Sequence, residues 1–255
     1  MNERPGRVVF IGAGPGTADL ITVRGARRLA EADVVLFDAL TDPALRELAP
    51  RARWVDVGKR GFCDSTGQAT IDALLVRFAR SHATVVRLKG GDPSVFGRLE
   101  EELQAVSDAG IECEVVPGIT AAMAAAAHTR RPLTRRGNGR SVSLTTAMTK
   151  QGRLQGARHA DTEVFYMAGR QLGALSRALR KAGWPEDTPA LVVSRAGWPD
   201  ALTSEHGIAE LATAAVLHAG RPTVVTVGAG ARAVAALPTS RDLERAQSGQ
   251  EALAP

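Results

Sequence analysis

Aromatic residues and cysteines are scarce in this chain of 255 residues. Phe, Trp and Tyr together make up 4% of the sequence, which leaves few rings for stacking nucleic-acid bases, so we expect no nucleic-acid partner. Cys63 and Cys113 are the only cysteines, and they form neither a disulfide framework nor the spacing of a metal site. A chain with so little cysteine is expected in the reducing cytoplasm.

Long apolar runs and several common catalytic signatures are also missing. No apolar run reaches the roughly 20 residues that span a bilayer, and the N-terminal residues lack the apolar region of a signal peptide. We therefore expect no membrane partner. The sequence contains no P-loop, no nucleophile elbow and no zinc-ligand spacing, so we expect no metal site.

Positive charge is in modest excess. The formal net charge is +5, which favours an anionic partner. Arginines are concentrated between residues 130 and 140, at Arg130, Arg131, Arg135, Arg136 and Arg140. Such a cluster is usually a solvated loop, but it could also receive a polycarboxylate or a phosphate backbone.

The order of apolar segments indicates an α/β protein with two lobes. In the first half, strands expected at 7–11, 34–37, 54–57, 85–88 and 113–116 alternate with helices at 22–31, 42–49, 71–78 and 99–109. This alternation favours a mainly parallel sheet. The second half has strand patterns at 142–145, 163–167, 191–194 and 223–227, with helices at 120–127, 171–181 and 208–215. Fewer helices separate these strands, so the second sheet is expected to be mixed. We predict lobes at 1–118 and 119–237, a flexible loop at 148–160 and a flexible tail at 238–255.

The most informative stretch runs from Val85 to Arg98. A short apolar strand is followed by Gly90, Gly91 and Asp92. Glycine lets the backbone adopt positive φ and lets a ligand approach closely. An acid at the carboxyl end of a strand, inside a glycine loop, is well placed to bind a polar ligand. An ordinary strand-to-helix turn is the alternative interpretation of the same residues.

A second glycine loop follows the first expected strand. Its glycines, Gly12, Gly14 and Gly16, fall at the first, third and fifth positions, whereas the dinucleotide-binding fingerprint requires the first, third and sixth. Pro15 also removes an amide donor from the turn. Asp38 ends the second strand, where a dinucleotide-binding protein would hold the ribose. An NAD-binding oxidoreductase is therefore an alternative that the glycine spacing disfavours.

Taken together, these motifs resemble the tetrapyrrole methylases. The resemblance spans about residues 7–230, and it includes Gly-Ala-Gly-Pro-Gly at 12–16, Gly-Lys-Arg at 58–60, the 85–98 stretch, Val-Val-Pro-Gly-Ile-Thr-Ala at 115–121 and Pro-Leu-Thr at 132–134. Within that family the sequence is most similar to the branch that methylates uroporphyrinogen III twice to give precorrin-2, which feeds sirohaem or cobalamin synthesis. Another tetrapyrrole (precorrin) methyltransferase is the nearest alternative. The resemblance implies a two-lobed fold with the active site between the lobes, and a homodimer.

The resemblance also implies a cofactor and the residues that bind it. S-adenosyl-L-methionine is expected in the cleft between the lobes, with S-adenosyl-L-homocysteine as its product. The positions that match the family's binding site are Pro15, Gly90, Gly91, Asp92, Val95, Thr120, Ala121, Met167 and Ala196. Ala196 stands where the family usually has a glycine.

Catalytic and substrate-binding positions follow from the same resemblance. A pyrrole carbon that accepts a methyl group must lose its N–H proton, and the family assigns this proton transfer to the acid that matches Asp38. The lysine that matches Lys59 is the expected proton donor. The substrate carries eight carboxylates, so Arg60, Arg98, Arg135 and Arg136 are candidate substrate contacts.

The sequence departs from the family's pattern at several positions near these motifs. Asp64 replaces a usual histidine, and Gly67 replaces a proline. Leu99 and Glu100 replace a pair of glycines. Arg135-Arg136 stands in place of a histidine-arginine pair. The changes at Asp64 and Arg135 fall in loops that should face the tetrapyrrole, so they bear on the substrate and the rate, not on the cofactor.

Overall fold

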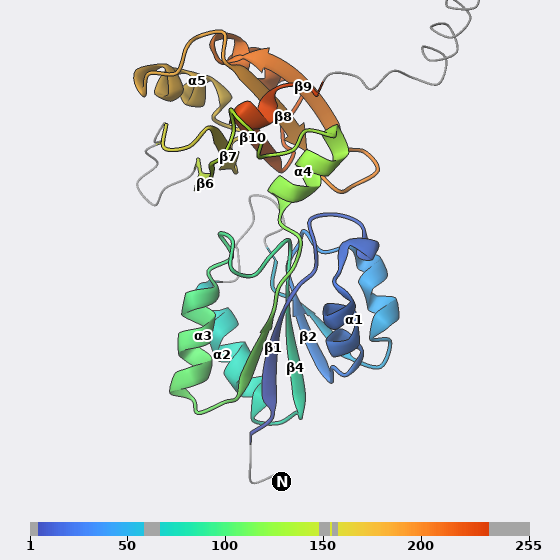
Figure 1. The fold of residues 1–255 in the computed structure, drawn as a ribbon. Coiled ribbons are helices and arrows are strands. Elements are labelled where there is room, and N and C mark those ends of the chain that lie inside the picture. Colours follow the sequence, from blue (N-terminus) through green and yellow to red (C-terminus); the bar gives the residue numbers. More distant parts are fainter. Residues whose placement is uncertain (1–4, 59–66, 148–153, 155–157, 235–255) are drawn as a thin grey trace, which may run out of the picture.

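Two five-stranded sheets make up the protein in a computed structural model, which describes residues 5–58, 67–147, 154 and 158–234. The first sheet uses the N-terminal half and the second the C-terminal half, and helix α4 (Ala121–Thr129) lies between them (Figure 1). Among the described residues, no helix is long and apolar enough to cross a membrane. The expected α/β fold with one parallel and one mixed sheet is confirmed; the division of the chain at Gly118 stays a prediction.

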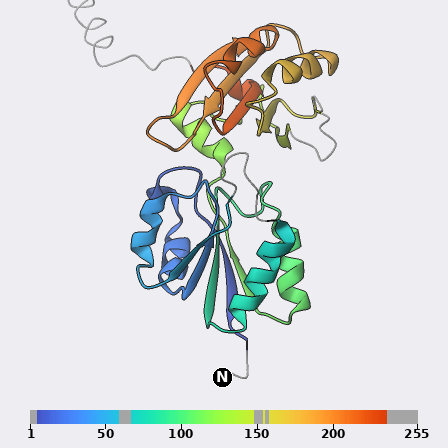
Figure 2. The same ribbon diagram turned by 180° about the vertical axis from the view of Figure 1, so that it is seen from behind.

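All strands of the first sheet run parallel, in the order β3-β2-β4-β1-β5. Its elements in chain order are β1 (Arg7–Gly12), α1 (Val23–Ala30), β2 (Val34–Phe37), η2 (Pro43–Leu48), β3 (Arg53–Asp56), α2 (Gln68–Ala79), β4 (Thr84–Lys89), α3 (Leu99–Asp108) and β5 (Cys113–Val116). Helices cover both faces (Figures 1 and 2). Along β1, Val8 and Phe10 pack toward α2 and α3, whereas Val9 and Ile11 pack toward α1 and η2. Burial on both faces explains why these strands read as continuous apolar runs.

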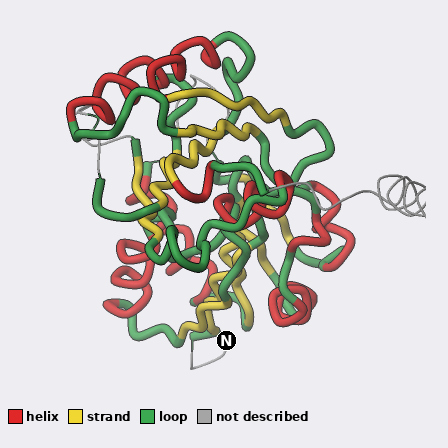
Figure 3. Tube along the Cα trace, turned by 45° about the horizontal axis from the view of Figure 1, so that its top comes forward, coloured by secondary structure: helices red, strands yellow, loops and turns green. Residues whose placement is uncertain are grey.

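The second sheet is mixed, in the order β6-β7-β10-β8-β9. Its elements are β6 (Val142–Thr146), β7 (Thr162–Tyr166), α5 (Leu172–Lys181), β8 (Pro189–Ser194), β9 (Leu202–Gly207), η3 (Ile208–Ala215) and β10 (Thr223–Gly228). Only β6 and β7 pair in parallel. One face packs on α5 and η3, and the other packs on α4. Figure 3 shows the strands in yellow, with helices in red both around them and between them.

The sequence pattern located most elements, and the exceptions have local causes. Thr22 caps α1 as expected, because its side chain accepts a hydrogen bond from the Gly25 amide at 3.1 Å. Asp42 caps the next segment in the same way, but that segment is a 3-10 helix. Strand β9 was not expected, because it is a polar edge strand without apolar alternation. The loop expected at 148–160 lies mostly outside the described residues, as does the tail expected at 238–255.

The buried side chain of His218 links strands β8 and β9 of the second sheet. His218 is fully buried, and its two ring nitrogens lie 2.9 Å from the hydroxyls of Ser194 and Ser204. Ser194 Oγ also accepts from Arg221 Nε at 3.1 Å. Burial lowers the pKa of His218, assisted by the nearby His206 and Arg221, and this favours the neutral ring.

The depressed pKa of His218 makes stability depend on pH. As the pH falls, the unfolded chain protonates this histidine at a higher pH than the folded chain does. The contribution of neutral His218 to the free energy of unfolding is therefore complete above about pH 6.5, the ordinary histidine pKa. It decreases as the pH falls from there through the folded-state pKa. Urea unfolding between pH 5 and 8 measures this loss. We expect His218→Gln to flatten the pH dependence and the exposed His128→Gln to leave it unchanged; equal slopes for all three proteins would contradict the assignment.

Candidate functional site

The candidate site lies where the connections of the first sheet change direction. The chain leaves β1 toward α1 on one face, whereas it leaves the neighbouring β4 toward α3 on the opposite face. Ligands of open α/β sheets bind outside the carboxyl ends of strands at such a point. The two loops meet there, because the amides and carbonyls of Gly14 and Gly91 form an isolated bridge with N–O distances of 2.7 and 3.2 Å.

Three glycines bring three backbone segments into direct contact at this point. A Cβ atom on Gly118 would lie 2.3 Å from the Gly91 carbonyl oxygen and 2.7 Å from the Gly12 Cα. Gly14 and Gly91 also have positive φ values of 80° and 73°. A Cβ at Gly12, Gly14 or Gly118 would come closer than 3.0 Å to backbone atoms, so only glycine fits there. At Gly16, which departs from the dinucleotide fingerprint, a Cβ would lie 2.1 Å from the Gly197 carbonyl oxygen, so packing between loops also explains this glycine.

Hydrogen bonds to Asp92 stabilise this contact between the three backbone segments. Its Oδ2 accepts a hydrogen bond from the Gly118 amide at 2.8 Å, and its Oδ1 accepts one from the Ser94 amide at 2.7 Å. The carboxylate thus joins the loop after β4 to the turn after β5. Asp92 also lines a cavity of about 580 Å³ together with Val95 and Thr120, so three of the predicted cofactor residues share one cavity.

Tyr166, at the end of β7, joins the segment that lines this cavity to the second sheet. The Tyr166 hydroxyl lies 2.7 Å from Thr120 Oγ1 and accepts from the Ala122 amide at 3.3 Å. Burial raises the pKa of Tyr166, which keeps the phenol protonated. Val95 and Ala121 pack on the same cluster. The tyrosine therefore holds the start of α4 against the second sheet.

The remaining predicted cofactor residues lie around this junction. Met167 directly follows Tyr166, with 46% of its side chain area exposed and a positive φ of 57°. Pro15 is half-buried, and its carbonyl lies close to Gly197, whose own carbonyl accepts from the Thr17 amide at 3.1 Å. Ala196 is buried in the core beneath α4, so its side chain does not face the cavity. Its neighbour Gly197 makes the contact between the lobes.

The predicted catalytic acid, Asp38, is held by a buried arginine. Asp38 follows β2, and its Oδ1 accepts from Arg87 Nη2 at 2.6 Å. Arg87 Nε donates to Glu102 at 2.9 Å, and Lys89 Nζ donates to the other Glu102 oxygen at 2.6 Å. Glu102 is fully buried, and Arg87 and Lys89 are nearly so, whereas the Asp38 side chain is 31% exposed. We call Lys89, Glu102, Arg87 and Asp38 the charge chain.

Burial and charge act differently on the two cations of the charge chain. Burial opposes the charge on Arg87, but attraction by Asp38 and Glu102 outweighs it and raises the Arg87 pKa. Burial lowers the pKa of Lys89, and repulsion by Arg87 lowers it further. Arg87 is therefore the fixed cation of the chain, and Glu102 is shared between the two.

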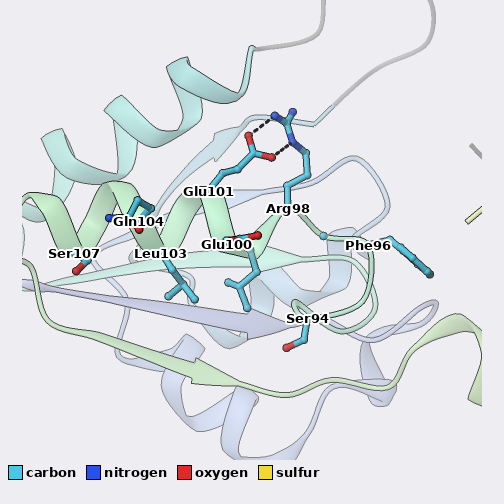
Figure 4. Close-up of a pocket in the computed structure, with 10 residues that line it drawn as sticks. Ser94, Phe96, Arg98, Glu100, Glu101, Leu103, Gln104 and Ser107 are labelled. Carbon is cyan, nitrogen blue, oxygen red and sulfur yellow. Dashed lines mark hydrogen bonds and ion pairs between the residues drawn. The ribbon is translucent and has the colours of Figure 1, made fainter. Parts of the chain in front are cut away.

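The loop that follows Asp92 carries Arg98 above the start of α3 (Figure 4). Arg98 makes a two-pronged ion pair with Glu101, with N–O distances of 2.8 and 2.5 Å. These residues line a second cavity of about 650 Å³ with Phe96 and Leu99, and Figure 4 shows Phe96 and Arg98 pointing away from one another. Leu99 begins α3, in place of the first glycine of the family's pair.

The arginine cluster at 130–140 is not a uniform binding surface. Arg131 is buried and pairs with Glu205, and the Arg135 guanidinium donates to the carbonyls of Arg232 and Ala233. Arg135 therefore anchors the segment after β10. Arg136 is exposed, and no hydrogen-bond partner for its side chain is found among the described residues.

Other predicted residues cannot be placed. Lys59, Arg60 and Asp64 lie outside the described residues. Gly58, which precedes Lys59, packs so closely on the chain after β2 that a Cβ there would lie 2.1 Å from the Ala39 amide nitrogen. The chain at the end of β3 therefore passes directly beside Asp38.

Backbone conformation marks site positions that sequence patterns miss. Among the described residues, the non-glycine positions with positive φ are Phe96, Arg98, Arg130, Met167 and Arg195. All except Arg130, which caps α4, follow the carboxyl ends of β4, β7 or β8. A left-handed non-glycine residue costs about 1 kcal/mol or more and clusters at functional sites. No sequence signal points to this strain, because none of these residue types favours it.

Sequence comparisons relate this arrangement to named enzymes. Residues 7–212 match the profile of the tetrapyrrole (corrin/porphyrin) methylases. A uroporphyrinogen-III C-methyltransferase of Pseudomonas aeruginosa is 40% identical over 244 residues, which cover 92% of this chain and 98% of that protein. The siroheme synthase of Zymomonas mobilis is 42% identical over 205 residues, but these cover 78% of this chain and only 44% of that protein. The chain therefore spans less than half the length of this second relative.

Solved structures of methyltransferases with related substrates are also similar to this chain. A uroporphyrin-III C-methyltransferase of Thermus thermophilus, complexed with S-adenosyl homocysteine, superposes with a TM-score of 0.76 at 36% identity, covering 88% of this chain and 97% of that one. A cobalt precorrin-4 methyltransferase superposes with a TM-score of 0.79 at 28% identity, covering 89% and 96%.

The close contact at Gly118 can be tested by adding one methyl group. We expect Gly118→Ala to lower the free energy of unfolding by about 1–3 kcal/mol, because the new Cβ meets only backbone atoms of Gly91 and Gly12. Gly173→Ala is the matched control: its Cβ would meet Ala212 at an ordinary 3.6 Å, and alanine in a helix stabilises by up to about 1 kcal/mol. Urea unfolding measures both, and equal effects of the two substitutions would contradict the packing argument.

Proposed function

This chain belongs to the tetrapyrrole methylase family, and we propose that it is an S-adenosyl-L-methionine-dependent C-methyltransferase that adds two methyl groups to uroporphyrinogen III to give precorrin-2. The observation that carries this proposal is the meeting of a glycine junction and a held carboxylate, Asp38, at the same edge of the parallel sheet. Similarity along nearly the whole chain to proteins named uroporphyrinogen-III C-methyltransferase supports the choice of substrate.

The cavity at the glycine junction fits a charged nucleoside such as S-adenosyl-L-methionine. Its volume of about 580 Å³ suits a molecule of that size, and its lining combines apolar side chains with the Asp92 carboxylate and the Thr120 hydroxyl. Asp92 complements a positive ligand, and Gly91 allows the ligand close to the backbone. We propose that these residues bind it together with Pro15, Gly90, Val95, Ala121 and Met167, and that Ala196 contributes through its backbone. When bound, S-adenosyl-L-methionine supplies an electrophilic methyl group.

In the proposed reaction this chain's own residues handle protons and hold the substrate. Asp38 accepts the pyrrole N–H proton, because it is a carboxylate at the carboxyl end of β2 whose Oδ2 has no partner among the described residues. Each transfer releases S-adenosyl-L-homocysteine and one proton, which Asp38 passes to solvent. Lys59 is the proposed proton donor beside the tetrapyrrole, and the course of the chain at Gly58 beside Ala39 supports its place near Asp38. Arg60, Arg98 and Arg136 bind substrate carboxylates; Arg135 supports the neighbouring segment and adds positive charge.

A precorrin methyltransferase is the second candidate. The high TM-score of 0.79 to a cobalt precorrin-4 methyltransferase supports it, because the same fold serves both substrates. The departures at Asp64, Gly67, Leu99 and Arg135 concern the substrate side of the site and would be consistent with either substrate.

We also propose that the protein works in the cytoplasm as a homodimer. The scarcity of cysteine supports the compartment. The homodimer is the assembly that similarity to the tetrapyrrole methylases implies.

The proposed reaction predicts the behaviour of two variants in an anaerobic assay with uroporphyrinogen III and methyl-labelled S-adenosyl-L-methionine. The unmodified protein should transfer two methyl groups for each substrate molecule. Asp38→Asn should reduce kcat by about 100-fold or more, and Lys59→Met should also reduce it, because each removes a proton-transferring group. Both variants should still bind S-adenosyl-L-homocysteine.

Failure of this assay would be informative. Binding of S-adenosyl-L-homocysteine without methyl transfer would move the substrate to a precorrin. Loss of both binding and transfer would exclude the proposed function.

The exposed Arg136 provides a test of substrate recognition. We expect Arg136→Ala to raise KM for uroporphyrinogen III about tenfold, because a charge-assisted hydrogen bond contributes about 1.5–3 kcal/mol. The affinity for S-adenosyl-L-homocysteine should not change. Arg80→Ala is the control, since Arg80 is equally exposed but lies just before β4, at the opposite edge of the sheet. An unchanged KM for Arg136→Ala would remove Arg136 from the substrate site.

A further inference from the structure

We infer that Arg87 is a positioning residue for Asp38, and that Glu102 and Lys89 hold Arg87 in place for that task. The inference rests on the proposed function, in which Asp38 accepts the pyrrole proton. It concerns three residues that would not contact the substrate, because all three are buried beneath the site.

The first argument is the number of contacts that fix the Arg87 guanidinium. Nη2 donates to Asp38 and Nε donates to Glu102, while Nη1 donates to the carbonyls of Leu36 and Leu88 at 3.4 and 3.2 Å. Leu36 is two residues before Asp38 on β2. Arg87 therefore binds both the backbone that carries Asp38 and its carboxylate, and the planar guanidinium leaves the Asp38 side chain little freedom.

The second argument is the asymmetry of exposure along the charge chain. Arg87 and Lys89 side chains are each 3% exposed and Glu102 is fully buried, but Asp38 is 31% exposed. The formal charges of the four residues sum to zero. The chain therefore ends in one accessible group, with Oδ1 bound by Arg87 and Oδ2 left to accept a proton.

The third argument is that the charge chain supports more than one part of the site. Glu102 lies next to Glu101 on α3, and Glu101 holds Arg98. A Cβ on Gly97 would lie 3.1 Å from the Lys89 side chain, so the loop before Arg98 rests on Lys89. Asp38 is thus held by Arg87, which Glu102 binds, and Arg98 is held by Glu101, the neighbour of Glu102 on α3.

Stability alone does not account for this arrangement. Burying the charges of Arg87, Lys89 and Glu102 costs desolvation energy, and apolar replacement of a buried ion pair is often neutral or stabilising. A purely structural charge chain could be replaced by apolar side chains with activity retained. A positioning role predicts the opposite result, namely a stable protein with a low kcat.

The test uses methyl transfer by the full chain with Arg87→Met, Arg87→Lys, Asp38→Asn and the double variant Asp38→Asn/Arg87→Met. We expect Arg87→Met to lower kcat by about 100-fold, the loss typical of a misplaced reacting group. KM for both substrates should stay within about threefold, because Arg87 touches neither. Arg87→Lys should recover part of kcat, since it keeps the charge but loses the fork. The double variant should be no slower than Asp38→Asn, because Arg87 acts through Asp38.

Two further variants are included: one controls for the loss of an ion-paired arginine, and the other replaces Arg87→Met if that variant does not fold. Arg28→Met is the control, because Arg28, like Arg87, pairs with two carboxylates, here Glu31 and Glu114, but lies on α1 away from Asp38; its kcat should not change. If Arg87→Met fails to fold, the triple variant Arg87→Met/Glu102→Leu/Lys89→Met, which removes every buried charge, takes its place with the same expected loss of kcat.

The outcomes separate this inference from the proposed function. Near-normal kcat in a folded Arg87→Met or triple variant, with Asp38→Asn inactive, overturns the inference alone. A double variant much slower than Asp38→Asn also overturns it, because Arg87 would then act independently. Full activity of Asp38→Asn, or no methyl transfer by the unmodified protein, overturns the proposed function and this inference with it.

Discussion

The contact of three backbone segments at Gly12, Gly91 and Gly118 is the constraint on which the rest of the structure depends. It occurs where neighbouring strands β1 and β4 send their helices to opposite faces, so it forms the floor of the site. Asp92 closes the contact by binding the Gly118 amide, and α4 begins directly beyond it. Because α4 packs on the second sheet, the position of that sheet over the site follows from the same contact.

Two different arrangements of polar groups lie at the candidate site: a hydrogen-bond network and a series of ion pairs. At the start of α4, the Ala122 amide, Thr120 and Tyr166 form a neutral hydrogen-bond network. At the ends of β2 and β4, four buried or half-buried charges are paired in series up to Asp38. The first arrangement suits close approach of a ligand, whereas the second fixes one carboxylate rigidly. Under the proposed function, ligand binding and proton transfer therefore take place at different strands of the same sheet edge.

Similar residues in this chain have different environments, and the environments decide their roles. Arg98 and Arg136 are exposed, whereas Arg87 and Arg131 are buried and paired. Arg135 lies in the same cluster as Arg136 but donates to backbone carbonyls. Counting arginines between 130 and 140 therefore overstates the charge that faces a substrate. Among the described candidates for substrate contact, the exposed Arg98 and Arg136 lie on separate loops.

The sequence by itself determined the alternating strands and helices, the family and the positions of the glycine loops, because these depend on local patterns of apolar residues and on residues that only one conformation accepts. It could also have hinted at the charge chain, since Arg87 and Lys89 interrupt a strand that is otherwise apolar. Only the tertiary structure decided that Glu102 lies beside Arg87 and Lys89 and that Ala196 packs in the core. It also decided that Arg135 donates to the backbone after β10 and that the polar segment β9 forms a strand. Each of these depends on contacts between residues distant in sequence, and single-residue chemistry does not encode such contacts.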